Sequence, residues 1–106
     1  MTDSITAEIV TFRTLPGHST AAVTVAARGL EQFLAACPGF ITRNLTQSED
    51  GTWTDHVLWS SLAEARAAGA KIMSDPGAGP FMAMIDGPSV RMSHAPVLLQ
   101  QKAKAA

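Results

Sequence analysis

The sequence has a single cysteine, no long hydrophobic run and no excess of basic residues. Because Cys37 has no second cysteine to pair with, an internal disulfide and a cysteine-based zinc site are both excluded. A net charge of -1 provides no basic surface for phosphate backbones, so a nucleic acid is not expected as a partner. The apolar runs are far shorter than the ~20 residues of a membrane span, and the first residues lack the basic region of a signal peptide. We therefore expect a cytoplasmic protein that does not enter a membrane.

The composition is that of an ordinary globular domain, with 46% hydrophobic and 16% charged residues among 106. A chain of this length forms one domain and buries roughly two thirds of the surface that its unfolded form would expose. The sequence contains no internal repeat and no low-complexity domain. We therefore interpret residues 1–106 as a single domain whose C-terminal tail covers residues 96–106.

The first half of the chain predicts a strand, a helix and a β-hairpin. Residues 5–14 alternate loosely and are rich in Ile, Val, Thr and Phe, which is typical of a strand. In residues 19–37 apolar side chains recur at three- and four-residue steps, which predicts an amphipathic helix capped by Ser19. Residues 40–47 and 52–60 are expected to pair around a turn at 48–51, where Asp50-Gly51 lies.

The second half predicts another helix, a short helical turn and a last strand. Ser61 and Glu64 have the spacing of a capping box, which starts a helix over residues 62–74. Pro80 can open a short helical turn over residues 81–86, and residues 89–94 alternate like a strand. The order β-α-β-β-α-β is that of a ferredoxin-like α+β sandwich with both helices on one sheet face. The other face is partly apolar, so we expect a second copy to cover it in a homodimer.

The length of the hairpin loop decides which side chains share a face with Asp55. A loop of two or four residues places Asn44 on that face, and the four-residue loop places it directly opposite Asp55. An odd loop exchanges the faces and brings His56 to the face of Asn44. We prefer the four-residue register because it gathers the largest apolar side chains beside Asp55, namely Phe40, Trp53, Val57 and Trp59. The other face would then carry Ile41, Arg43, Leu45, Thr54, His56 and Leu58.

Two histidines, His56 and His94, lie on predicted strands. If these strands are adjacent, the two side chains would meet on the dimer face as structural or pH-sensitive interface groups. A metal site usually needs three convergent ligands, and the sequence offers no third. We therefore expect no metal.

Several short motifs between residues 5 and 94 resemble the antibiotic biosynthesis monooxygenase family of the dimeric α+β barrel superfamily. They are Pro38-Gly39-Phe40, Asp50-Gly51-Thr52, the spacing from Asp55 to Trp59 followed by Ser60-Ser61, and Asp75-Pro76. The resemblance implies a dimeric α+β barrel with a pocket between sheet and helices in each subunit. It also implies small aromatic or polyketide-like substrates. Some members oxidise phenols to quinones with molecular oxygen and neither metal nor flavin, so no cofactor is expected.

The resemblance carries over unevenly to individual positions. Trp59 falls on the strand tryptophan of the quinone-forming members, whereas Asp55 stands where those enzymes have an asparagine. Ala65 stands at the place of a pocket tyrosine, and Met82 stands near that of an arginine. The segment 81–85 contains no histidine, which separates this chain from the haem-degrading relatives.

Asp55, Asn44 and Trp59 are the candidate catalytic residues of a cofactor-independent monooxygenase. Such an enzyme needs a base to deprotonate its substrate, and burial beside two tryptophans would make Asp55 a better base than an exposed aspartate. Asn44 would orient Asp55 or bind a substrate oxygen, and Trp59 would stack on a planar ligand. The expected substrate-binding residues are Phe40, Trp53, Val57, Phe81, Met82 and Met84.

Other interpretations of the same residues stay open. Asp55 could move a proton without oxygen, as in an isomerase, lyase or decarboxylase. The differences at Ala65 and Met82 are also compatible with a non-catalytic homodimer that binds a small molecule. In that case Asp55 and Asn44 would be a structural cross-strand pair, and Trp59 would be a core residue that joins helix to sheet.

Overall fold

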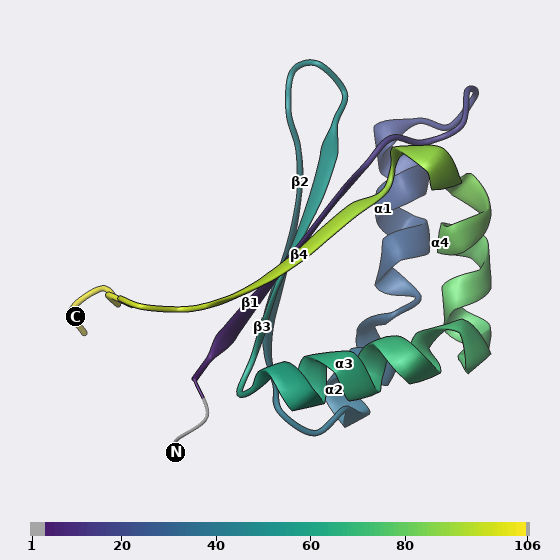
Figure 1. Cartoon of the computed structure of the whole chain (residues 1–106). Helices are drawn as coiled ribbons and strands as arrows, with labels where there is room; N and C mark the ends of the chain where they lie inside the picture. Colours follow the sequence, from purple (N-terminus) through teal and green to yellow (C-terminus); the bar gives the residue numbers. More distant parts are fainter. Residues whose placement is uncertain (1–3, 106) are drawn as a thin grey trace.

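The computed structural model describes residues 4–105 and confirms the predicted ferredoxin-like α+β order (Figure 1). The strands are β1 Thr6–Phe12, β2 Phe40–Gln47, β3 Trp53–Trp59 and β4 Arg91–Pro96. They form one antiparallel sheet in the order β2-β3-β1-β4. Residues 1–3, on which the signal-peptide argument depended, and residue 106 of the tail lie outside the described residues.

The first predicted helix is divided in two, α1 Thr20–Arg28 and α2 Glu31–Ala36. The break falls at Gly29, where an added Cβ would lie only 2.5 Å from the carbonyl oxygen of Gly77. The continuous helix predicted over residues 19–37 is therefore wrong, because the backbone tightens here, with the N–H groups of Gly29 and Leu30 donating to the carbonyl oxygens of Ala26 and Ala27, three residues back. The predicted cap is confirmed, since Ser19 Oγ accepts a hydrogen bond from the backbone N–H of Ala22.

The second predicted helix, α3 Leu62–Lys71, starts with the expected capping box. Ser61 Oγ accepts a hydrogen bond from the Glu64 backbone N–H at 3.2 Å and donates one to Glu64 Oε1 at 3.1 Å. The chain then passes through the 3-10 turns η1 Ile72–Ser74 and η2 Pro76–Ala78 into α4 Gly79–Met84. Pro80 lies in the first turn of α4, as predicted, and a third 3-10 turn, η3 Gly87–Ser89, leads into β4. Within residues 4–105, no helix is both long enough and apolar enough to cross a bilayer.

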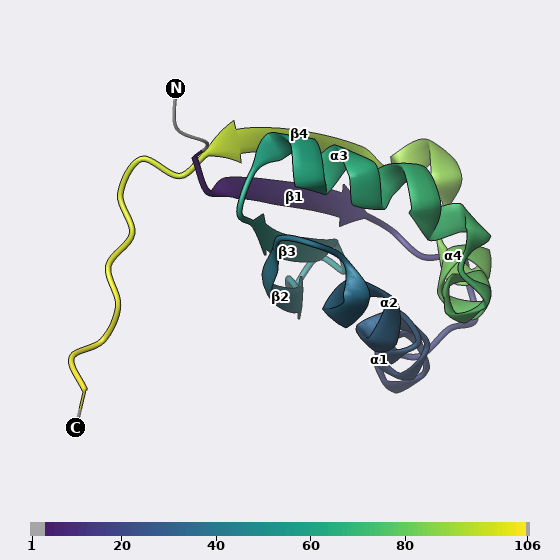
Figure 2. The same cartoon turned by 90° about the horizontal axis from the view of Figure 1, so that it is seen from below.

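The helices lie on one side of the sheet, and the described residues 4–105 leave the other side uncovered (Figure 1 and Figure 2). α3 contacts β1 and β3, α2 contacts β2, and α1 contacts α4. Trp53 and Trp59 are 3% and 1% exposed, so both tryptophans face the helices as predicted. The hydrophobic core between the layers comprises Phe12, Val23, Ala26, Ala27, Leu30, Leu34, Trp53, Val57, Trp59, Ala65, Ala68, Ala78 and Phe81.

The hairpin has a different register from the one that we preferred. Gln47 pairs with Trp53, so the loop holds the five residues 48–52 rather than four. The loop is stabilised by Asp50, whose Oδ1 accepts hydrogen bonds from Ser48 Oγ at 2.8 Å and from the Thr52 N–H at 2.9 Å. This odd loop places Asn44 opposite His56 on the uncovered face. The predicted pairing of Asn44 with Asp55 is therefore wrong.

A β-bulge in β2 returns Phe40 to the helix side of the sheet. The register shifts between Phe40 and Thr42, so Phe40 still pairs with Trp59. The rings of Phe40 and Trp59 meet edge to face with centroids 5.8 Å apart. Beyond the bulge, alternation turns Arg43 and Leu45 towards the helices. The prediction that these two residues lie on the other face is wrong.

Candidate functional site

A cavity of about 390 Å³ lies between the sheet and the helices. Its wall is mainly apolar and comes from β1, β3, α2, α3, α4 and the segments that follow them. Within the described residues, its charged side chains are those of Glu8, Arg43 and Asp55. A mostly apolar cavity of this size with a few convergent polar groups has the character of a small-molecule site.

The cavity wall contains part of the predicted site, namely Asp55, Trp59, Val57, Phe81 and Met82. The other predicted residues lie elsewhere. Trp53 is buried in the core, where its ring stacks on Phe12 at a centroid distance of 6.2 Å, and Met84 packs against that core. Phe40 borders a separate open groove beside α1 and α2. Asn44 is exposed on the uncovered sheet face, because the five-residue loop turns it away from the helices.

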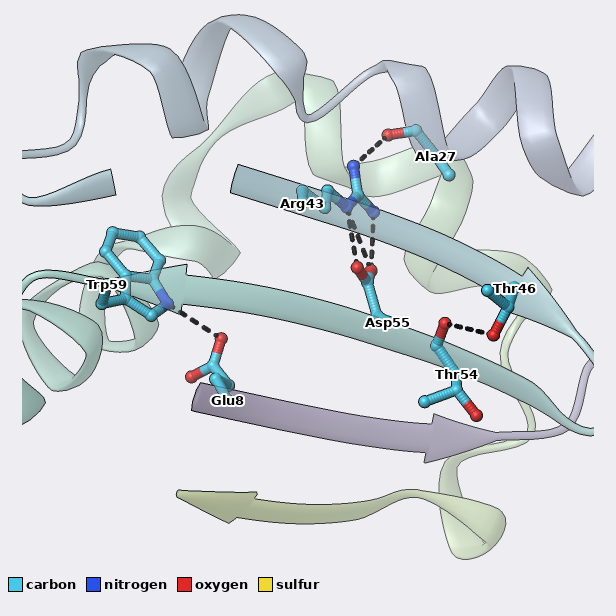
Figure 3. A network of polar contacts seen from close by, with 7 residues as sticks. All are labelled: Glu8, Ala27, Arg43, Thr46, Thr54, Asp55 and Trp59. Atoms are coloured by element: carbon cyan, nitrogen blue, oxygen red, sulfur yellow. Dashed lines mark hydrogen bonds and ion pairs between the residues drawn. The ribbon is translucent and has the colours of Figure 1, made fainter. Parts of the chain in front are cut away.

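Asp55 is held by an ion pair with Arg43 that the sequence analysis did not anticipate (Figure 3). Arg43 Nε donates to Asp55 Oδ1 at 2.9 Å and Nη2 donates to Oδ2 at 2.7 Å, while Nη1 donates to the carbonyl oxygen of Ala27 at 2.8 Å. Each of the two charged side chains is only 12% exposed. A carboxylate with both oxygens bound by a fixed cation is poorly placed to take a proton from a substrate. We therefore interpret Asp55 as an anchor that joins β3 to β2 and α1.

Glu8 on β1 is a second acid on the cavity wall, and it contacts two polar partners. Its Oε2 lies 2.6 Å from Nε2 of His94 on β4, and its Oε1 accepts a hydrogen bond from Trp59 Nε1 at 3.4 Å (Figure 3 shows the latter contact). The side chains of Glu8 and His94 are 13% and 21% exposed. Where Glu8 is ionised, Nε2–H of His94 donates this short hydrogen bond, because a carboxylate can only accept. The pair thus holds a proton beside the cavity.

The sequence contained a signal for Glu8 that we did not use. Thr6, Val10 and Phe12 share its side of β1, and Phe12 is 2% exposed, so alternation places a charged residue among core positions. Its partner His94 is 86 residues away along the chain, and no local pattern connects the two. An acid on the core side of a strand requires a polar partner, and this requirement was the available signal.

The two strand histidines do not meet. β1 lies between β3 and β4, and His94 turns towards the helix side while His56 is exposed on the uncovered face. His56 Nε2 lies 3.4 Å from Thr46 Oγ1. We expected the two histidines to meet only if their strands were adjacent, and this condition is not fulfilled. In the part of the chain from residue 4 to residue 105, no three His, Cys, Asp or Glu side chains gather in a way that could hold a metal ion.

Fold and cavity together define a ferredoxin-like α+β domain with an internal, mainly apolar site. No protein-family model and no curated protein matches the sequence. Solved structures do match. A single-residue variant of SnoaB, a cofactor-independent oxygenase from Streptomyces nogalater, has a TM-score of 0.72 and 16% identity over 92% of this chain and 96% of that chain.

Two further structures show how widely the fold is shared. The monooxygenase ActVA-Orf6 of Streptomyces coelicolor, solved with the ligand nanaomycin D, has a TM-score of 0.68 and 16% identity over 95% of this chain and 94% of that chain. A protein of unknown function from Nitrosomonas europaea has a TM-score of 0.68 and 14% identity over 99% of this chain and 100% of that chain.

These matches confirm the fold that the sequence resemblance implied. Several other matching structures carry the name of the antibiotic biosynthesis monooxygenase family. At such low identities the likeness establishes the fold alone, because one fold supports many activities. The chemistry of this chain depends on the residues of its own cavity.

Proposed function

We propose that this chain is a homodimeric, cofactor-independent monooxygenase that acts on a small aromatic or polyketide-like molecule. The observation that supports the proposal best is the cavity of about 390 Å³, with Trp59, Phe81 and Met82 on a mainly apolar wall beside charged groups. A flat aromatic molecule gains most from such a wall, since its apolar surface leaves water while the flexible side chain of Met82 adapts to its outline. The likeness to SnoaB and ActVA-Orf6 makes oxygen chemistry the first activity to test.

The proposed reaction needs only a proton acceptor and a dry site from the protein. For an anthrone it reads R₂CH₂ + O₂ → R₂C=O + H₂O, in which the substrate carbon is oxidised and oxygen is reduced. One oxygen atom enters the substrate, and the other leaves as water with both hydrogens. Deprotonation makes the substrate electron-rich enough to give electrons to oxygen. The chain would supply the base, the orientation and the exclusion of water.

Oxygen consumption tests this function directly. An oxygen electrode would follow 1,8-dihydroxyanthrone, quinols and naphthols with the wild type and with Met82→Trp, which fills the cavity. The control is Ala83→Leu, an exposed neighbour on the same helix that does not line the cavity. We expect uptake with the wild type and the control, and a loss of about ten-fold or more in kcat/KM with Met82→Trp. A wild type that consumes no oxygen with any of these compounds would contradict the proposal.

The proton held between Glu8 and His94 favours one other candidate, an isomerase or lyase that moves a proton without oxygen. Deuterium incorporation into an enolisable ketone such as 2-tetralone, measured without oxygen, would reveal this activity. Exchange without oxygen uptake favours proton transfer alone. Binding of 2-naphthol with neither activity identifies a non-catalytic binding protein.

A further inference from the structure

We propose that Glu8 is the catalytic base of this cavity and that His94 and Trp59 position its carboxylate. The inference rests on the proposed function, because a base is needed only where a substrate loses a proton. The proposed base is Glu8 and not Asp55, although the sequence pattern indicated Asp55. The two acids differ in whether a carboxylate oxygen is free to accept a proton.

The two acids of the cavity differ in how their oxygens are occupied. Both oxygens of Asp55 accept short hydrogen bonds from the guanidinium of Arg43. Glu8 Oε2 is likewise engaged by His94, but Oε1 has only the indole N–H of Trp59 at 3.4 Å. That contact is longer than the usual 2.9–3.0 Å of an N–H···O bond. Glu8 Oε1 is therefore the carboxylate oxygen that retains the capacity to take a proton.

The position of Glu8 in the sheet places Oε1 where a ligand in the cavity can contact it. β1 is a central strand, and Glu8 pairs with Val57 on β3 and with His94 on β4. Val57, Trp59 and Met92 surround it on the cavity wall. A ligand in the cavity would reach Oε1 beside the buried indole of Trp59, because the indole nitrogen itself contacts that oxygen.

Other charges at the cavity do not compete for this role. Arg43 and Asp55 share the wall with Glu8, but they are paired with each other at 2.7 Å. The helical residues that close the cavity are uncharged, namely Leu34, Ala68, Gly69, Phe81 and Met82 together with Phe33. His94 is thus the titratable partner in direct contact with Glu8 among the described residues.

In the proposed step a substrate proton moves to Glu8 Oε1. A C–H or O–H bond of the substrate breaks and a bond forms between that hydrogen and Oε1. The electron pair stays on the substrate as an enolate or phenolate. His94 keeps its hydrogen bond to Oε2 throughout and holds the carboxyl group in place. With oxygen as co-reactant, Glu8 later passes the proton to the oxygen atom that leaves as water. Without oxygen, it returns the proton to another carbon of the substrate.

Glu8→Gln tests the inference, because glutamine keeps the size of the side chain but cannot act as a base. We expect kcat with 1,8-dihydroxyanthrone, or the exchange rate with 2-tetralone, to fall by about 10²-fold or more. The affinity for 2-naphthol, measured by quenching of tryptophan fluorescence, should change by less than about three-fold. The matched control is Glu31→Gln, an exposed acid on α2 outside this cavity, which should retain wild-type rates.

His94→Gln separates a positioning role from a merely structural one. This variant keeps a hydrogen-bond donor near Glu8, whereas His94→Leu removes it. We expect kcat to fall by about ten-fold or more with His94→Leu and to be largely retained with His94→Gln, while KM stays near the wild-type value in both variants. Equal losses of kcat with the two variants, or a loss that appears in KM instead, would overturn the positioning role of His94.

The outcomes distinguish this inference from the proposed function. An active wild type whose rate survives Glu8→Gln, or falls only with Asp55→Asn, overturns the assignment of the base and leaves the function standing. A wild type that neither consumes oxygen nor exchanges protons overturns both. If Glu8→Gln does not fold, Glu8→Asp replaces it, because the shorter acid keeps the charge but withdraws Oε1. With that variant kcat should fall while KM stays near the wild-type value, and an unchanged kcat would overturn the inference.

Discussion

Nη2 of Arg43 lies 2.7 Å from Oδ2 of Asp55, and the same guanidinium donates a hydrogen bond to the carbonyl oxygen of Ala27. The contact joins β2, β3 and α1 at a largely buried point on the wall of the cavity. The Cζ atom of Arg43 also lies 5.8 Å from the centre of the Phe81 ring, which is a cation–π distance. Arg43 thus supports the cavity from one side, while Glu8 faces it from the central strand.

Removing one partner of this ion pair should be costly. We expect Asp55→Ala to lower the free energy of unfolding by about 3–5 kcal/mol, because it leaves a largely buried guanidinium without its counter-charge. The double variant Arg43→Met/Asp55→Leu should recover most of that loss. Urea denaturation followed by circular dichroism would measure both. The control is Glu31→Ala, which breaks an exposed pair with Arg28 and should cost less than about 1 kcal/mol. Equal losses at the two sites would contradict the anchoring role of Asp55.

The close approach at Gly29 predicts opposite effects for two glycine substitutions. Gly29→Ala places a Cβ only 2.5 Å from the carbonyl oxygen of Gly77, so the backbone has to move, at a cost of about 1–3 kcal/mol. Gly69→Ala adds a Cβ within α3 where no atom lies within 4 Å, and alanine in a helix should stabilise the protein by roughly 0.5–1 kcal/mol. Thermal melts of the two variants would check the signs. A melting temperature that rises with Gly29→Ala would disprove the close contact.

The uncovered sheet face predicts that the protein forms a dimer. Ile9 and Leu58 lie on this face beside His56, and no helix of the described chain covers them. Leu58→Glu should give a monomer, because it places a charge in the proposed interface. The control Ala67→Glu adds the same charge on an exposed position of α3 and should leave a dimer. Size-exclusion chromatography with light scattering at micromolar concentration distinguishes the two, and a monomeric wild type would refute the dimer.

The hairpin loop should be sensitive to acid. The hydrogen bond from the Thr52 backbone N–H, followed by that from Ser48, lowers the pKa of Asp50 from 3.8 to about 2, with a smaller contribution from Arg13. Because the pKa is lower in the folded state, this stabilisation is fully present above pH 3.8 and is lost as the pH falls through about 2. NMR titration should therefore show the Thr52 amide changing with a midpoint near that pH. Asp50→Asn should abolish the transition and Glu49→Gln should preserve it, whereas a midpoint at pH 3.8 in the wild type would contradict these contacts.

Much of the fold could be predicted because it depends on neighbours along the chain. Trp53, Val57 and Trp59 alternate on β3, so their common burial, and that of Asp55 between them, follows from the strand period alone. The capping box at Ser61 and Glu64 and the proline at the start of α4 are equally local signals. The close approach of the Gly77 carbonyl to Gly29 was not predictable in this way, since the two glycines lie on different segments.

The site was predicted only in part, because a single residue of loop length changes every cross-strand partner. The turn residues around Asp50-Gly51 are compatible with four or five residues, and the hydrogen bonds of Asp50 stabilise the longer loop. That difference placed Arg43 rather than Asn44 next to Asp55, and so replaced a neutral partner by a cation. The bulge before Thr42 keeps Phe40 on the buried face. The pattern of apolar residues in β2 therefore did not reveal that the predicted four-residue register was wrong.

By itself, the sequence determined the order of the elements and the side of each central strand that faces the helices, because both follow from local periodicity and turn chemistry. Tertiary structure alone decided which polar groups meet. Glu8 and His94 come within 2.6 Å because β4 returns beside β1, and Arg43 reaches Asp55 because the hairpin has an odd loop. Strand order and register depend on the packing of the whole domain, so the polar partners of the cavity could not be derived from the residues around each of them.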